Sequence, residues 1–181
     1  MPSRAAVRGF SIIELMITVA LAGIMAAIAA PAMTKVFRSN RVQTETAALA
    51  SDMQFARSEA VKRGQSVSLC ASSDGATCLG ANTWDKGWII FFDPAGNGAW
   101  DSANDQVLRV RKPFVGGDTL AASPSATSVT FNREGFTSNL GTSLSTFQLH
   151  TSDGDSAATR CVVLNISGRL KTHTAGQGSC S

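Results

Sequence analysis

One acidic side chain, Glu14, stands inside a run of apolar residues that extends from Phe10 to Met33. A lone carboxylate in such a run costs several kcal/mol if it enters a membrane without a partner. Glu14 is the fifth residue counted from Phe10, so it could neutralise a cation on a neighbouring subunit, most simply a free α-amino group. The alternative is a carboxylate that reaches the membrane interface by itself. Either reading makes Glu14 the residue of chemical interest in this segment.

Three basic residues, Arg160, Arg169 and Lys171, lie in a C-terminal segment that has no acidic residue from Thr159 onward. On a strand, Arg169 and Lys171 would face the same side because they are two residues apart. Adjacent cations suit phosphate contacts, which give salt-sensitive affinity for nucleic acid of any sequence. The alternatives are solvated bases at a strand end, or a surface that docks a neighbouring subunit. The net charge of +3 does not decide between them, since the chain from Gly64 onward has eight basic and nine acidic residues.

Four cysteines, Cys70, Cys78, Cys161 and Cys180, all follow the apolar segment. They show no CxxC spacing and form no zinc pattern with the two histidines. An even set of this kind predicts disulfides formed in an oxidising compartment. Three pairings are open, and Cys70–Cys78 with Cys161–Cys180 is favoured because each pair closes a short, glycine-rich loop.

The sequence offers little for catalysis or for metal binding. Calcium is the obvious metal for Asp93, Asn97, Asp101 and Asp105, but their spacing fails the EF-hand pattern and these residue types are usual in turns. The chain has no Tyr, two His, and no GxSxG or phosphate-binding loop. We therefore expect no catalytic residue, no metal and no cofactor.

The N-terminal segment predicts a processed membrane helix. Residues 1–9 are polar and basic and end in Gly9, and the only candidate cleavage site, Gly9–Phe10, precedes the apolar run. A secretory signal peptide would instead be cut after its apolar run. The uncharged stretch Leu15–Thr34 is 20 residues long, about 30 Å of helix, which suffices to cross a bilayer. Arg4 and Arg8 predict that the N-terminal end stays in the cytoplasm and that the rest crosses the membrane.

The run GFSIIEL, residues 9–15, resembles the prepilin peptidase site of type IV pilins and type II secretion pseudopilins. This resemblance implies that the peptidase cuts after Gly9 and methylates the new N-terminal Phe10. It also implies that Glu14 guides docking into a filament. Pro31 stands where such pilins often carry a proline, and it is expected to kink or locally melt the helix.

An amphipathic helix is predicted to continue over residues 35–63. Its apolar positions recur at spacings of three, four and seven residues: Val42, Leu49, Met53, Ala56 and Ala60. The stripe that they form predicts packing against a sheet, and Gly64 is the expected stop.

Residues 64–181 are predicted to form a β-rich globular domain. Short runs typical of strands are separated by Gly, Asn, Asp and Ser: Ser66–Ala71, Gly87–Phe92, Gln106–Arg111, Ser128–Asn132, Thr146–His150 and Cys161–Ile166. One long helix followed by short strands predicts an α+β fold in which antiparallel sheets pack on the helix, as in type IV pilins. The expected organisation is a leader (1–9), a transmembrane and assembly half of the helix (10–34), an amphipathic half (35–63) and the globule.

Three further segments resemble the GspH/FimT-type minor pilins and pseudopilins, a family that includes FimU-like proteins. They are residues 53–64 (MQFARSEAVKRG), residues 84–93 (WDKGWIIFFD) and the glycine-containing stretch 96–109 that follows. Gly168-Arg169-Leu170-Lys171 also resembles the Gly-Arg-x-Arg motif of DNA-binding FimT-type pilins, which serve DNA uptake in natural transformation. Lys171 in place of Arg keeps the charge but loses bidentate phosphate geometry.

Together these features predict a minor pilin of a type IV pilus in a Gram-negative bacterium, involved in pilus assembly or initiation. The alternative is a minor pseudopilin of a type II secretion system. The expected partners are other pilins, the prepilin peptidase, the inner membrane and, through Arg160, Arg169 and Lys171, double-stranded DNA. The expected location is the inner membrane with a periplasmic globule, and then the pilus at the cell surface.

Overall fold

The computed structural model describes residues 10–141 and 144–180. It divides into two compact units, Met1–Arg38 and Ser39–Ser181. One helix, α1 (Ile12–Arg63), contributes to both units, and every strand belongs to the second.

Helix α1 is continuous through Pro31, which contradicts local melting, one of the two outcomes expected at this residue. The helix ends where the sequence predicts. Gly64 has φ +65°, its N–H donates to the carbonyl of Val61, and the N–H of Gln65 donates to the carbonyl of Ala60. These bonds satisfy carbonyls of the last turn, and glycine adopts this left-handed conformation without a Cβ penalty.

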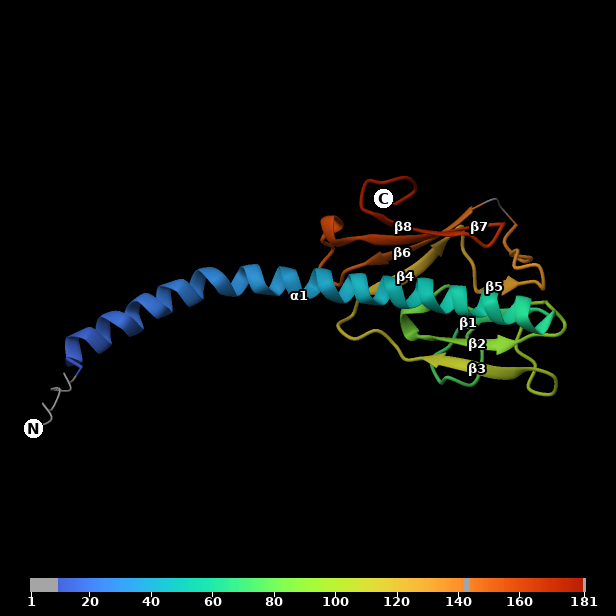
Figure 1. Ribbon diagram of the computed structural model, residues 1–181, viewed down its shortest axis with the longest axis horizontal. Helices are drawn as coiled ribbons and strands as arrows, with labels where there is room; N and C mark the ends of the chain where they lie inside the picture. Colours follow the sequence, from blue (N-terminus) through green and yellow to red (C-terminus); the bar gives the residue numbers. More distant parts are fainter. Residues whose placement is uncertain (1–9, 142–143, 181) are drawn as a thin grey trace, which may run out of the picture. The chain divides into compact units, whose positions relative to one another are not determined.

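The strands form two four-stranded antiparallel sheets (Figure 1). The first sheet has the order β3 (Gln106–Arg111), β2 (Trp88–Phe92), β1 (Val67–Ala71), β5 (Ser128–Phe131). The second has the order β4 (Thr119–Ser123), β6 (Leu144–His150), β7 (Arg160–Asn165), β8 (Leu170–Thr174). All pairs within both sheets are antiparallel, which confirms the predicted α+β fold.

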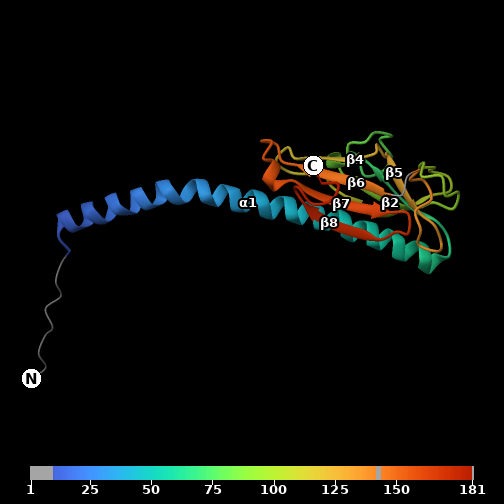
Figure 2. The same cartoon turned by 90° about the horizontal axis from the view of Figure 1, so that it is seen from above.

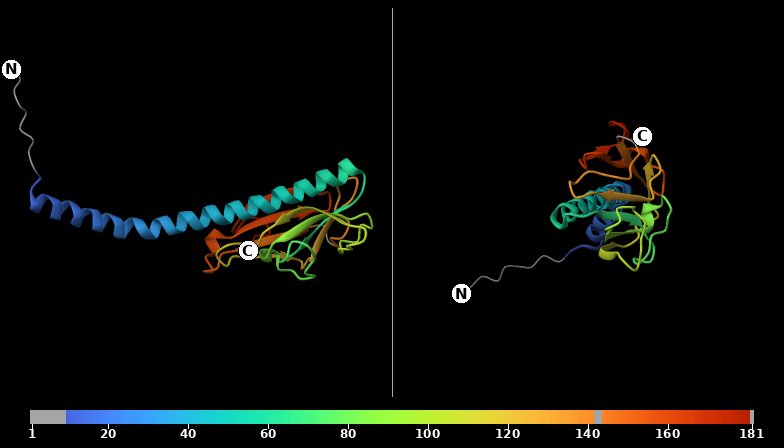
Figure 3. Two further views of the ribbon diagram at one scale, coloured as in Figure 1. Left: turned by 90° about the horizontal axis from the view of Figure 1, so that it is seen from below. Right: turned by 90° about the vertical axis from the view of Figure 1, so that its right-hand side faces the viewer.

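Both sheets pack on the same side of the second half of α1. Figure 1 shows β1, β2 and β3 on one flank of this half and β6, β7 and β8 on the other. In Figures 2 and 3, which turn the molecule by 90°, the sheets lie together on one side of the helix. The helix therefore covers the region where the two sheets meet.

The apolar stripe of the helix forms part of one hydrophobic core with both sheets. Val42, Leu49, Met53, Ala56 and Ala60 are all fully buried, as the spacing predicts. The sheets add large side chains to the same cluster, among them Trp88, Phe131 and Phe147, and the short 3-10 helix η1 (Trp84–Lys86) adds Trp84. Burying an aliphatic or aromatic side chain of this size contributes about 1.5–3 kcal/mol, so the stripe anchors the helix to the globule.

Six of the eight strands match predicted segments to within two residues at each end. The sequence pattern predicts neither β4 (Thr119–Ser123) nor β8 (Leu170–Thr174). Strand β4 is short and buries only Leu120 and Ala122, and β8 is an edge strand in which Leu170 alone is apolar. Apolar periodicity is the main strand signal, and partly exposed edge strands carry little of it.

Buried ion pairs connect the helix to each sheet. The side chain of Asp52 is fully buried and accepts hydrogen bonds from Arg109, Arg111 and the indole of Trp88. Nearer the start of the unit, Arg41 forms two bonds of 2.7 and 2.8 Å with the buried carboxylate of Asp118. Bidentate arginine–carboxylate pairs fix geometry as well as charge, so these contacts set how the helix lies on the sheets.

The carboxyl of Glu45 lies close enough to the Arg41–Asp118 pair to interact with both charges. The Oε2 atom of Glu45 is buried and has no hydrogen-bond partner among the described residues. Burial and the neighbouring charge of Asp118 raise the pKa of the Glu45 carboxyl to about 7, although Arg41 opposes the shift. Between pH 4.5 and about 7, the Glu45 carboxyl is therefore mostly protonated in the folded protein and mostly ionised in the unfolded chain.

We expect the contribution of Glu45 to stability to be largest below pH 4.5 and to be lost as pH rises through about 7. Glu45→Gln, which is neutral at every pH, should be more stable than the parent at pH 8 and similar to it at pH 5. Melting temperatures at both pH values check this. If Glu45→Gln has the same melting temperature as the parent at both pH values, the expected contribution of Glu45 is contradicted.

Candidate functional site

The first unit presents an apolar helix surface with no cover from the described residues. The large apolar side chains of residues 12–28 are more than half exposed, with Ile28 at 72% and Ile12 at 81%. By length and composition, α1 can cross a membrane. Exposed apolar surface on this scale marks a membrane or protein interaction site, because water disfavours it.

Glu14 lies in the first turn of this helix. The carbonyl of Ser11 accepts the N–H groups of Glu14 and Leu15, which places the start of the helix immediately after Phe10. An acidic residue in the first turn interacts favourably with the positive end of the helix dipole. Phe10 is itself 75% exposed, and Gly9 with the rest of the proposed leader lies outside the described residues.

A tight hairpin turn positions Arg169. Asn165 Oδ1 accepts hydrogen bonds from the hydroxyl of Ser167 and the N–H of Arg169. Gly168 has φ +71°, and a Cβ at this residue would overlap the carbonyl oxygen of Gly135 and the side chain of Arg57. Only glycine fits both the conformation and the space, so Gly168 fixes where Arg169 leaves the turn.

The structure places the three predicted DNA-binding cations on two faces. Lys171 pairs with Val163, and Arg169 lies two residues before it, so both belong to the face of the sheet away from α1. Arg160 pairs with Thr174 and shares its face with the core residues Val162 and Leu164. Arg160 therefore faces the helix and does not join the other two cations.

Arg57 is a basic residue near this turn that the sequence analysis did not connect with it. Its Nε atom donates to the carbonyl of Gly135, next to Gly168. Arg57 lies on α1, far from Arg169 in the sequence, and a local motif search cannot join residues so distant. The helix therefore adds a cation close to the Gly168 turn.

The acidic residues of the loop after β2 accept hydrogen bonds from that loop and, in the case of Asp93, also from β1. Asp93 accepts from the hydroxyl of Ser68 and from the N–H groups of Gly96 and Gly98. Asp105 accepts from the N–H of Asp101. These carboxylates act as turn-forming acceptors, the role that is usual for these residue types.

Two disulfides are present, Cys70–Cys78 and Cys161–Cys180, which are the favoured pairs. The first links β1 to the loop that follows it, and the second ties the C-terminal segment to β7. The second bond also bears on the candidate site, because the segment that it holds lies beside β8.

Comparisons with known proteins agree with these features. The family described as "Type II transport protein GspH" matches residues 45–168, and the "Prokaryotic N-terminal methylation motif" matches residues 4–30. The comparison with curated proteins finds no match.

Three solved structures share the fold. The type IV minor pilin FimU of Pseudomonas aeruginosa is 23% identical, with a TM-score of 0.59 over 76% of this chain and 92% of that chain. The minor pseudopilin EpsH from the type 2 secretion system of Vibrio cholerae is 12% identical, with a TM-score of 0.51 over 76% and 99% of the two chains. Escherichia coli GspH is 13% identical, with a TM-score of 0.52 over 78% and 93%.

The matching proteins are filament subunits of the pilin type rather than enzymes. The two family matches cover the apolar helix at one end and the helix–sheet globule at the other. With its fold, these matches show that the chain is a membrane-anchored subunit that assembles with other pilins or pseudopilins. The chain therefore belongs to the GspH/FimT family of type IV minor pilins and type II secretion pseudopilins.

Proposed function

We propose that this chain is a minor pilin of a type IV pilus and takes part in pilus assembly or initiation. The observation that carries the proposal is the exposed apolar surface of residues 12–28, interrupted near its start by the single carboxylate of Glu14. Such a surface needs a membrane before assembly and neighbouring helices after it. Relative to exposure in water, covering each large side chain by lipid or by neighbouring helices contributes about 1.5–3 kcal/mol.

In this proposal, the prepilin peptidase cuts between Gly9 and Phe10 and methylates Phe10. Cleavage creates a cationic amine on Phe10, and Glu14 of one subunit neutralises the amine of its neighbour. Before cleavage the subunit spans the inner membrane with its globule in the periplasm, where both disulfides can form. After cleavage it enters the pilus at the cell surface.

We expect Glu14→Ala to leave membrane insertion and cleavage intact but to lower incorporation into sheared filaments about tenfold or more. A charge-assisted bond contributes about 1.5–3 kcal/mol, and each 1.4 kcal/mol is tenfold in an equilibrium. The matched control is Thr18→Ala, because the Thr18 hydroxyl already bonds to the carbonyl of Leu15 in its own helix. Normal incorporation of Glu14→Ala would contradict the role given to this carboxylate.

The alternative assignment is a minor pseudopilin of a type II secretion system. Deleting the gene separates the two. Loss of pili with normal protein secretion supports the pilus assignment, and loss of secretion with normal piliation supports the alternative.

DNA binding, as for uptake in natural transformation, is a second candidate function, favoured by Arg169 and Lys171. Both side chains are exposed, lie on the same face, and form no ion pair with another described residue. Two cations give weak binding by themselves, so the affinity should fall steeply as salt is raised.

We expect Arg169→Ala with Lys171→Ala to abolish gel-shift binding of a DNA duplex by the full chain in detergent at low salt. Arg160→Ala is the control, because Arg160 lies on the opposite face and should leave this binding almost unchanged. If the double variant binds as the parent does, or if the parent does not bind at low salt, the chain has no DNA role at this hairpin.

A further inference from the structure

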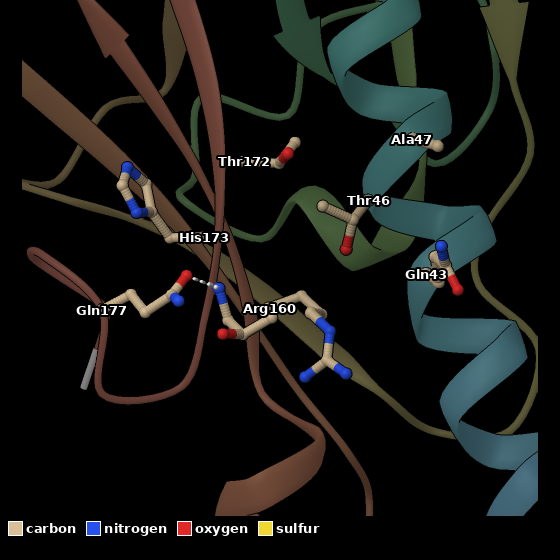
Figure 4. Close-up of a pocket in the computed structure, with 8 residues that line it drawn as sticks. Gln43, Thr46, Ala47, Arg160, Thr172, His173 and Gln177 are labelled. Atoms are coloured by element: carbon tan, nitrogen blue, oxygen red, sulfur yellow. Dashed lines mark hydrogen bonds between the residues drawn. The ribbon is translucent and has the colours of Figure 1, made fainter.

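A groove of about 350 Å³ lies between α1 and the edge strand β8 (Figure 4). The helix lines one wall and the end of β7, β8 and the C-terminal loop line the other. The lining residues are Gln43, Thr46, Ala47, Arg160, Thr172, His173, Thr174 and Gln177. The groove is lined mainly by polar side chains, unlike the apolar core cluster between the helix and the sheets.

Arg160 is the one permanently charged residue among the eight, and none of them is acidic. Figure 4 shows its guanidinium extending from β7 into the space beside the helix, whereas the ring of His173 points away from the helix. Nη1 of Arg160 donates to the carbonyls of Ala157 and Thr159. Those bonds hold the side chain in place and leave its other donors available, within the described residues, for an anionic group.

Three residues of the edge strand β8, Thr172, His173 and Thr174, line the same groove. Ala175 donates to the carbonyl of Thr159 at one end of the β7–β8 pair, and Asn165 donates to the carbonyl of Arg169 at the other. Hydrogen-bonded positions alternate along an antiparallel pair, so Lys171 and His173 bond to β7. The N–H and C=O of Leu170, Thr172 and Thr174 therefore point away from β7, toward the edge.

One of these edge groups is already covered. The N–H of Thr174 donates to Oε1 of Gln177 at 3.4 Å, a long bond that an incoming carbonyl could replace. Thr172 is exposed, and its edge-facing N–H and C=O have no partner among the described residues. An extended backbone placed along β8 would satisfy them as a further strand does.

We propose that this groove binds an extended peptide segment that adds to β8 as an edge strand and places a carboxylate on Arg160. The alternating donors and acceptors of the Leu170–Thr174 edge match a peptide backbone, whereas the sugar–phosphate backbone of a nucleic acid has no N–H donors. The absence of acidic lining residues favours an acidic side chain or a C-terminal carboxylate over a cationic one. This site uses neither the apolar helix residues nor Arg169 and Lys171, so it stands independently of the pilus and DNA proposals.

The test uses the full chain in detergent and a fluorescent five-residue probe peptide, blocked at both ends, of alternating threonine and valine with a central glutamate. A second probe carries glutamine at the centre, and a third has N-methylated backbone amides. The acidic probe should bind about tenfold more tightly than the glutamine probe. The N-methylated probe should bind at least about tenfold more weakly than its parent, because it cannot pair with the edge.

The variants separate the two contacts. Arg160→Gln should remove the preference for the acidic probe and leave binding of the glutamine probe unchanged. Thr172→Pro removes an N–H that faces the edge rather than β7, and should weaken both peptides about tenfold or more. Lys171→Ala, on the outer face, should bind both peptides within about twofold of the parent.

Amide hydrogen exchange provides a second measurement on the unaltered chain, in which the acidic probe should slow exchange at Thr172. Equal binding of the acidic and glutamine probes, or unchanged exchange at Thr172 with saturating probe, would overturn the proposal. So would a result in which Arg160→Gln weakens binding of a DNA duplex and leaves the peptide unaffected.

Discussion

Asp52→Ala is expected to destabilise the globular unit by about 3 kcal/mol, at the lower end of the range for removing one partner of a buried ion pair. The Asp52 side chain is fully buried, and it accepts from two arginines and from the indole N–H of Trp88 at 3.1 Å. Without the carboxylate, a buried indole N–H loses its acceptor and two positive charges lose their partner. Arg109 and Arg111 are each 39% exposed, so water can solvate them in part, which keeps the loss below the upper end of that range.

The packing of Arg109 adds to this effect, since its guanidinium stacks 3.8 Å from the centre of the Phe55 ring. An arginine freed from Asp52 need not keep that position, and the contact between the helix and β3 would weaken. Urea denaturation of the purified chain measures the loss. Glu134→Ala is the matched control, because Glu134 pairs with Arg133 at the surface and should change stability little. Equal stability of Asp52→Ala and Glu134→Ala would show that Asp52 does not fix the helix on the sheet.

Replacing both Cys161 and Cys180 with serine is expected to cost about 3 kcal/mol, the value for closing a loop of this length. The disulfide spans a sequence separation of 19 residues and ties the C-terminal segment to β7. It also holds Ser179, whose hydroxyl lies 2.7 Å from that of Thr146 on β6. Removing the bond should therefore free the segment as well as lower global stability.

Two measurements distinguish the loss of global stability from the release of the C-terminal segment. Chemical denaturation reports the global loss, and amide exchange at Thr174 reports release of Gln177, which covers that N–H. Ser179→Ala is the control, because it removes the Thr146 contact and keeps the disulfide, and its cost should be about 1 kcal/mol. A double serine variant that unfolds at the parent's urea concentration would contradict the stabilising role of this disulfide.

Structure could be predicted best from the sequence where it depends only on residues close together in the chain. The spacing of Val42, Leu49, Met53, Ala56 and Ala60 predicts a buried helix face, and all five are fully buried because a helix repeats every 3.6 residues whatever it packs against. Gly64 ends the helix for an equally local reason, the left-handed conformation that glycine accepts. The N-terminal motif needs only its own residues in order, and a family match covers it.

The sequence was least informative where side chains distant in the chain had to be placed on one side of a sheet. It grouped Arg160 with Arg169 and Lys171, but the β7–β8 register places Arg160 on the helix face and the other two on the outer face. It missed β8 because an edge strand needs few apolar residues, and with β8 it missed the groove that this strand lines.

The membrane-anchored helix with Glu14 near its start could therefore be predicted from the sequence alone, because charge, length and residue order suffice to recognise such a helix. The partners of Asp52 and the environment of Arg160 were decided only by the tertiary structure. Both depend on strand register and on which sheet face meets the helix, and a shift of one residue reverses the face on which every side chain of a strand lies.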